Sequence, residues 1–222
     1  MIQNSTISDH SQSKIIPVVG IAGGSGSGKT TLAREAMQTL NHQVTLIPFD
    51  SYYRDLSLIP EEERGKTNFD HPDALEISLL QSHLLALKLG QAIPCPMYDF
   101  VTHTRTGSAP LTAEELIFIE GTLILAIPEI HSLIDLSFFI DIPDDIRLLR
   151  RIRRDMDDRG RSFNFIEMQY MKMVRPMYQQ YILPSRTRAD HILNGEESIS
   201  RLTQIVKEKV ETWMEEQSSV IR

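Results

Sequence analysis

A glycine-rich stretch near the amino terminus has the residue types and spacing to hold phosphate groups. Residues 23–30 read GGSGSGKT and fit the pattern G-x-x-x-x-G-K-S/T. Glycines allow positive φ angles and carry no Cβ, so successive backbone N–H groups can turn inward around phosphate oxygens. The Lys29 ammonium can reach the β and γ phosphates, and the Thr30 hydroxyl can bind Mg2+. The nucleotide-binding residues predicted here, called the phosphate loop below, are Gly23, Gly24, Ser25, Gly26, Ser27, Gly28, Lys29, Thr30 and Thr31.

The residues on either side of the phosphate loop supply the elements that it needs. Residues 18–22 form an apolar, β-branched run typical of a buried strand, and residues 29–40 have helical character. The alternative, a flexible glycine-serine turn with a surface lysine, requires neither element. The loop alone does not identify the acceptor of a phosphate, because switches, motors, transporters and kinases share it.

Carboxylates follow or end two other predicted strands. Residues 44–49 read as a strand that ends at Asp50, with Pro48 indicating a strand end or a sheet edge. Residues 115–121 read as a buried strand with Glu120 near its end. Because ligands bind at the carboxyl ends of parallel strands, Asp50 is a candidate general base and Glu120 a candidate Mg2+ support. Asp50 could instead cap a turn, and Asp70 is either a turn residue or an acceptor for ligand hydroxyls.

Two further segments have unusual composition. Residues 93–105 combine prolines, aromatics and β-branched residues, which predicts a β-ribbon insertion over 93–109. Within it, Tyr98 and His103 suit the binding of a flat polar ring. Residues 147–161 contain seven arginines, although the chain is acidic overall. This segment is either a salt-bridged solvent face or a lid over 145–163 that closes on phosphates.

The apolar residues of the arginine-rich segment have helical spacing. Ile146, Leu149, Ile152 and Met156 predict an apolar face. Arg147, Arg150, Arg151 and Arg154 lie around the remaining faces. A longer helix is expected over residues 169–183, kinked or divided at Pro176, followed by a strand at 189–193 and a helix at 199–214.

Length and composition suit one α/β domain over residues 15–222 after a flexible leader at 1–14. The chain has 222 residues, 41% of them hydrophobic, a net charge of −7 and a single cysteine. The acidic balance argues against a nucleic-acid partner, and no apolar run is long enough for a membrane span or a signal peptide. A cytoplasmic location is the resulting expectation.

Several blocks, in order along the chain, resemble the uridine kinase family, also called uridine-cytidine kinases. The blocks are GGSGSGKTTLA, DSYYRD, NFDHPDAL, PMYDFVTHTR, IEG, RLLRRIRRDMDDRGR and VRPMYQQYILPS. The resemblance implies a P-loop NTPase three-layer fold with a mostly parallel sheet and a tetrameric assembly. It also implies transfer of the γ-phosphate of ATP or GTP, with Mg2+, to the 5′-hydroxyl of uridine or cytidine.

The resemblance also implies roles for individual residues. Asp50 takes the place of the general base, and Lys29, Arg154 and Arg159 take catalytic places at the phosphates. Mg2+ places fall to Thr30, Glu120 and Asp50. The nucleoside contacts implied are Asp70, Tyr98, His103, Arg151, Arg161 and Gln169.

Two other functions remain open from the sequence. A phosphoribulokinase-like enzyme would share the phosphate loop and the aspartate but would need a basic pocket for a phosphorylated acceptor. A nucleotide-binding regulator would bind the triphosphate without turnover. The chain departs from the family pattern at Phe49, Leu183 and residues 194–197.

Overall fold

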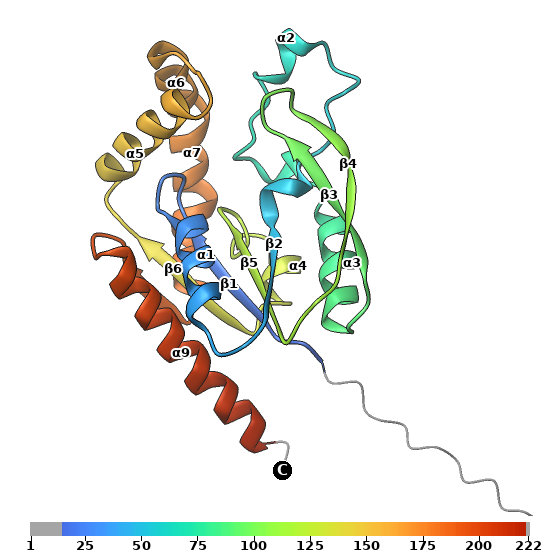
Figure 1. Ribbon diagram of the computed structural model, residues 1–222. Helices are drawn as coiled ribbons and strands as arrows, with labels where there is room; N and C mark the ends of the chain where they lie inside the picture. Colours follow the sequence, from blue (N-terminus) through green and yellow to red (C-terminus); the bar gives the residue numbers. More distant parts are fainter. Residues whose placement is uncertain (1–14, 221–222) are drawn as a thin grey trace, which may run out of the picture.

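A parallel sheet forms the central layer of the molecule (Figure 1). The computed structural model describes residues 15–220, so the predicted leader at 1–14 lies outside the described residues. Within that range the sheet has five strands in the order β2-β5-β1-β6-β7, as the resemblance implies. Their bounds are β1 Val18–Gly23, β2 Val44–Pro48, β5 Leu116–Gly121, β6 Leu136–Asp141 and β7 His191–Asn194.

Helices cover both faces of the sheet, which explains why its central strands are apolar throughout. Side chains of β1 alternate between the two cores, with Val18 on one face and Val19 on the other. Helices α1 (Lys29–Thr39) and α9 (Ile199–Val220) cover the Val19 face, and α9 continues beyond the predicted end. Helices α3 (Ile77–Lys88) and α4 (Pro128–His131) cover the other. No helix of residues 15–220 has the length and hydropathy to cross a bilayer.

The predicted β-ribbon is an antiparallel hairpin beside α3, on the α2 side of the molecule (Figure 1). Strand β3 (Ile93–Asp99) pairs with β4 (Thr104–Leu111), and the register shifts between Met97 and Tyr98. Short helix α2 (Glu61–Arg64) lies near the tip of the hairpin, where the Arg64 guanidinium donates to the Thr102 carbonyl at 3.0 Å. The hairpin lies beside the carboxyl-terminal ends of the strands (Figure 1).

The helix predicted around Pro176 is continuous but irregular. Helices α6 (Phe163–Gln169), α7 (Arg175–Met177) and α8 (Leu183–Ser185) are joined by π-helical turns at residues 170–174 and 178–182. Proline has no N–H to donate, so the backbone around Pro176 departs from regular α-helical bonding. We call this continuous stretch, residues 163–185, the π-turn helix.

Two tyrosines of the π-turn helix contact opposite parts of the molecule. The Tyr178 ring lies under the Arg147 guanidinium at 3.7 Å, on the side of α5 (Asp144–Asp157). The Tyr181 hydroxyl lies 3.1 Å from His71 Nε2, on the side of the 3₁₀ turn at residues 72–74. The π-turn helix therefore stands between α5 and the turn that carries Asp70.

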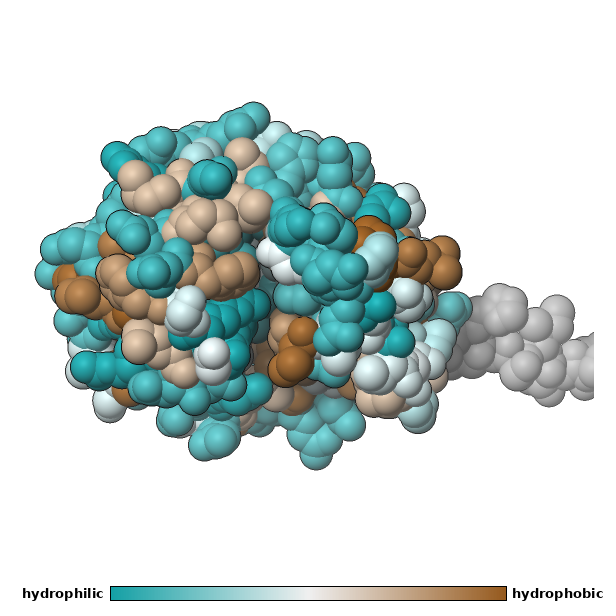
Figure 2. Space-filling model, turned by 90° about the horizontal axis from the view of Figure 1, so that it is seen from above, coloured by the Kyte–Doolittle hydropathy of each residue, from teal (hydrophilic) through white to brown (hydrophobic). Residues whose placement is uncertain are grey.

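The apolar residues of helix α5 do not face the core, although an apolar face of a helix usually does. Leu149 is 68% exposed and Met156 is 45% exposed, whereas Arg147, Arg151 and Asp155 are buried. The charged face turns inward because Arg147 stacks on Tyr178, while Arg151 and Asp155 pair with each other and with neighbouring polar groups. Seen from above in Figure 2, brown hydrophobic side chains lie on the outer surface over α5 and α6.

Candidate active site

The carboxyl ends of three neighbouring strands meet beneath one cavity. Strand β5 lies between β2 and β1, and Glu120 pairs in register with Pro48 on one side and Ile21 on the other. The phosphate loop follows β1, and Asp50 follows β2 in a 3₁₀ turn at residues 49–52. The fold therefore brings together the residues that the sequence analysis placed at strand ends.

The phosphate loop has the backbone that its glycines predict. Gly26 has φ +81° and Gly28 has φ +92°, both in the left-handed region. A Cβ at Gly26 would also collide with the Arg147 carbonyl oxygen, so the loop rests directly on α5. Helix α1 begins at Lys29 with Gly28 as its N-cap, so the positive end of the helix dipole lies at the loop.

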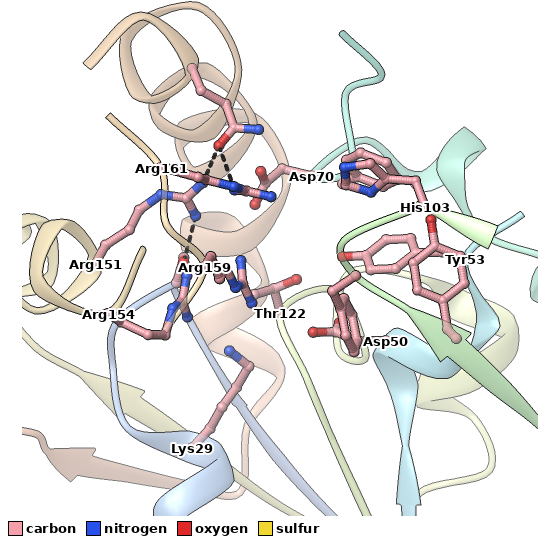
Figure 3. A pocket seen from close by; sticks show the side chains of 15 residues that line it. Lys29, Asp50, Tyr53, Asp70, His103, Thr122, Arg151, Arg154, Arg159 and Arg161 are labelled. Carbon is pink, nitrogen blue, oxygen red and sulfur yellow. Dashed lines mark hydrogen bonds between the residues drawn. The ribbon is translucent and has the colours of Figure 1, made fainter. Parts of the chain in front are cut away.

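Figure 3 shows the cavity and the side chains around it. Seen from above, the surface is hollowed between the α5 and α6 side and the hairpin side (Figure 2). The lining comes from the phosphate loop, the turn after β2, the 68–70 turn, the hairpin, the end of β5, and the α5 and α6 region. Its residues are Ser25, Lys29, Asp50, Tyr53, Phe69, Asp70, Tyr98, Phe100, His103, Thr122, Arg151, Arg154, Arg159, Arg161 and Gln169.

Lys29 and Asp50 point into the cavity from separate elements (Figure 3). One Asp50 carboxylate oxygen is buried and, among the residues that the structure describes, has no hydrogen-bond partner. Lys29 likewise makes no ion pair within residues 15–220. Phe49, a departure from the family pattern, is fully buried, and a Cβ at Gly121 would lie 2.6 Å from its side chain. Gly121 thus makes room for Phe49, and Asp50 still faces the cavity.

An aromatic wall closes the hairpin side of the cavity. Phe69 stacks on His103 with ring centroids 4.6 Å apart and meets Tyr53 edge-on at 5.2 Å. Burial, followed by the nearby charges of Arg161 and Arg159, lowers the pKa of His103, so its imidazole is neutral at pH 7. The Tyr98 hydroxyl is buried and finds no partner in the described part of the chain. This wall offers flat apolar faces together with polar groups that can bond to a ligand.

Asp70 faces the same space from the turn before the 3₁₀ segment at 72–74. Burial raises the pKa of Asp70, against the opposing charge of Arg151. Burial, with the charges of Asp50 and Asp70, also raises the pKa of Tyr53, which therefore stays protonated at neutral pH. A desolvated carboxylate beside a phenol can bind ligand hydroxyls strongly.

Four arginines line the opposite wall: Arg151, Arg154, Arg159 and Arg161, called the pocket arginines below. Arg151 Nη1 donates to Ser25 Oγ at 2.8 Å, which ties α5 to the phosphate loop. Its Nη2 donates to Gln169 Oε1 at 2.6 Å, and Arg161 donates to the same oxygen at 3.4 Å. The wall is therefore a positively charged surface held by α6 and the phosphate loop.

Glu120 and Thr30 lie below the cavity without lining it. Burial raises the pKa of Glu120, which is opposed by the Lys29 charge and by a hydrogen bond from the Thr30 side chain, while the Asp50 charge adds to the rise. The described residues hold no cluster of three or more His, Cys, Asp or Glu side chains. Two carboxylates and a hydroxyl nevertheless fit Mg2+, which takes few protein ligands and keeps waters and phosphate oxygens.

Four residues that line the cavity were not predicted as site residues from the sequence: Tyr53, Phe69, Phe100 and Thr122. Tyr53 and Phe69 belong to polar, aromatic loops, and that composition was the available signal. Phe100 and Thr122 line the cavity because of where the hairpin turn and the end of β5 lie, and no sequence pattern identifies them. The remaining residues of the phosphate loop flank the cavity without lining it.

The fold and the site define a P-loop kinase, with the phosphate loop and an aromatic wall facing one cavity. The model of the Phosphoribulokinase / Uridine kinase family matches residues 18–198, and the chain belongs to that family. A uridine kinase of Halobacterium salinarum is 42% identical over 195 residues, covering 87% of this chain and 86% of the relative. A uridine kinase of Klebsiella pneumoniae is 43% identical, covering 89% and 96%.

Solved structures share the fold at low sequence identity. Phosphoribulokinase from Rhodobacter spheroides matches with a TM-score of 0.63 and 15% identity, covering 83% of this chain and 74% of that one. A D-glycerate 3-kinase from Cryptococcus neoformans matches with a TM-score of 0.58 and 13% identity, covering 82% and 87%. Kinases with different acceptors thus share this architecture.

Proposed function

We propose that the chain is a nucleoside kinase that transfers the γ-phosphate of ATP or GTP to the 5′-hydroxyl of uridine or cytidine, giving the nucleoside monophosphate. One observation carries the proposal. Lys29 and Asp50 face a single cavity whose hairpin wall is aromatic and includes a neutral His103. The same wall carries the Tyr98 hydroxyl, which has no hydrogen-bond partner among residues 15–220. Such a wall suits an uncharged planar base, and the relatives named uridine kinase support the same acceptor class.

In the proposed reaction, Asp50 accepts the proton of the 5′-hydroxyl. As the bond from O5′ to the γ-phosphorus forms, the bond from that phosphorus to the bridging oxygen of the β-phosphate breaks and the diphosphate leaves. Lys29, Arg154 and Arg159 stabilise charge on the transferred group. Asp70 holds the ribose hydroxyls, while Tyr98 and His103 contact the base.

We also propose how the chain binds the metal ion, how it contacts the nucleoside, and where and in what assembly it acts. Thr30, Glu120 and Asp50 would hold Mg2+, which neutralises phosphate charge during transfer. Arg151, Arg161 and Gln169 would make further contacts with the nucleoside. We propose a cytoplasmic homo-oligomer, tetrameric by resemblance to the family, and its mass in solution can be measured by light scattering.

The test is release of ADP from ATP, or of GDP from GTP, with a panel of nucleosides, run beside ribulose 5-phosphate as a phosphorylated sugar. Turnover with uridine or cytidine is expected. Turnover only with the sugar phosphate would indicate a phosphoribulokinase-like enzyme, and triphosphate binding without turnover would indicate a regulator.

Asp50→Asn tests the proposed base. Turnover should fall by at least about 100-fold with triphosphate binding retained, because a positioned base contributes about 10²–10⁴-fold. Asp73→Asn is the control, since the Asp73 side chain is 91% exposed and lies outside the cavity. Normal turnover of Asp50→Asn would remove Asp50 from the base position.

A further inference from the structure

Asp155 is a buried carboxylate that the proposed chemistry does not use. It is fully buried on the inner face of α5 and does not line the cavity. Each of the pocket arginines nevertheless reaches it. The nitrogen-to-oxygen distances are 3.6 Å from Arg151, 2.8 Å from Arg154, 3.4 Å from Arg159 and 3.4 Å from Arg161.

The contacts to Asp155 use only part of each guanidinium. Arg154 donates Nε and Nη2 to Oδ1 at 2.9 and 2.8 Å, and Arg159 approaches the same oxygen with Nη1 alone. The other nitrogens remain available, and both side chains line the cavity. Arg154 and Arg159 therefore lie between Asp155 and the cavity. Asp155 contacts one edge of each guanidinium.

The chain also folds back to place Arg159 and Arg161 beside Asp155. Gly160 has φ +62°, and the Arg161 N–H donates to the Asp155 carbonyl at 3.0 Å just beyond the end of α5. Arg161 shares a second acceptor, Gln169 Oε1, with Arg151. Both the side chain and the backbone of Asp155 thus organise this turn.

Electrostatics keep Asp155 ionised. Burial by itself would raise the pKa of Asp155, but the charges of Arg154 and Arg151 and the hydrogen bond from Arg154 hold it below its ordinary value. A single carboxylate does not neutralise four guanidiniums, so the wall keeps an excess of positive charge facing the cavity. A buried anion that serves several cations fixes their directions while leaving most of their charge uncancelled.

We propose that Asp155 is a positioning residue for phosphoryl transfer, which aims Arg154 and Arg159 at the transferred phosphate. This inference rests on the proposed kinase function. Preorganised charge lowers the barrier only when its direction is fixed before the reaction. Asp155 also competes with phosphate for the same cations. Its removal should therefore lower kcat without weakening the affinity for the triphosphate.

The experiment compares Asp155→Asn with Asp157→Asn, which removes the same charge from an exposed position of α5. Calorimetry with a non-hydrolysable ATP analogue gives the triphosphate Kd, and ADP release with uridine gives kcat. We expect kcat of Asp155→Asn to fall by at least about 30-fold, with Kd unchanged or lower. Complete loss of one donor that stabilises the transition state reduces kcat by about 10²–10³-fold. Asp157→Asn should match the wild type in both.

These measurements distinguish a positioning role of Asp155 from a purely structural one. A kcat of Asp155→Asn within about twofold of the wild type, or a parallel loss of kcat and triphosphate affinity, would overturn the inference. If the Asn variant does not fold, Asp155→Glu keeps the charge and moves it by one methylene. Reduced kcat at unchanged Kd is then expected, and wild-type kcat overturns the positioning role. A wild-type chain without nucleoside-dependent turnover would instead contradict the proposed function.

Discussion

The phosphate loop and helix α5 both present positive charge to one cavity, but they are built in opposite ways. The loop uses backbone N–H groups, and its geometry depends on residues without side chains. Helix α5 uses side chains, with Arg151 and Arg154 lining the cavity while Leu149 faces solvent. Backbone geometry follows from local sequence, whereas the inner face of a helix is decided by what the rest of the chain packs against it.

The two regions also depend on each other. The Arg147 carbonyl fills the space where a Cβ of Gly26 would lie, and Arg151 donates to Ser25. The inward position of Arg151 therefore links α5 to the loop, because an apolar side chain at residue 151 could not donate a hydrogen bond to Ser25. Substitutions in each region test how far the loop and the helix depend on each other.

Gly26→Ala should have the largest effect. It places a Cβ against the Arg147 carbonyl and forces a side chain into a left-handed backbone, which costs about 1–2 kcal/mol before the collision is counted. We expect loss of kcat/KM for ATP by at least about 100-fold. Gly65→Ala is the control, since no atom lies within 4 Å of its new Cβ. Wild-type activity in Gly26→Ala would contradict the close fit of loop and helix.

Asp70→Asn should have an intermediate effect, and it compares the half-buried carboxylate of Asp70 with the fully buried carboxylate of Asp155. Arginines lower the pKa of Asp155, whereas burial raises the pKa of Asp70. Loss of a charged acceptor of ligand hydroxyls should reduce kcat/KM for the nucleoside by about 10- to 100-fold, because such hydrogen bonds contribute about 1.5–3 kcal/mol.

The same variant should be more stable than the wild type at neutral pH. With its pKa above the ordinary value of about 3.9, folded Asp70 holds its proton more tightly than the unfolded chain does. Ionisation of Asp70 therefore costs stability as the pH rises through the raised pKa. Thermal unfolding between pH 4 and 7.5 should show an advantage for Asp70→Asn that shrinks toward pH 4. An equal difference at every pH would show that Asp70 ionisation does not limit stability.

Leu149→Ser should have the smallest effect. In an ordinary amphipathic helix this change would remove a core contact, but Leu149 is 68% exposed. The free energy of unfolding should change by no more than about 0.5 kcal/mol, as for other surface positions. Ile166→Ser in α6, where the side chain is fully buried, should cost about 3 kcal/mol or more by chemical denaturation. A large loss for Leu149→Ser would show that α5 does bury its apolar face.

Much of the fold follows from sequence because its signals are local. The apolar strand before the phosphate loop, Pro48 at the end of an edge strand and the proline-rich hairpin all appear where the pattern predicts them. The faces of α5 could not be predicted, because they depend on Tyr178 and Gln169, which are more than a dozen residues away in sequence.

The candidate site shows the same limit. Asp50, Tyr98 and His103 carry signals in their own segments, and they lie in one cavity. Thr122 and Phe100 line the cavity only because distant segments meet beside them. The burial of Phe49 next to Asp50 likewise needs the absent side chain of Gly121, on another strand.

The π-turn helix has one further consequence. Tyr178 touches Arg147, one turn before Arg151, and Tyr181 touches His71, next to Asp70. The π-turn helix thus separates α5 from the turn that carries Asp70, and its thickness sets the width of the cavity between them. The width of the cavity limits which molecules fit, in addition to the polarity of its lining. A substitution that repacks Tyr178 or Tyr181 would therefore change the width without changing any group that lines the cavity.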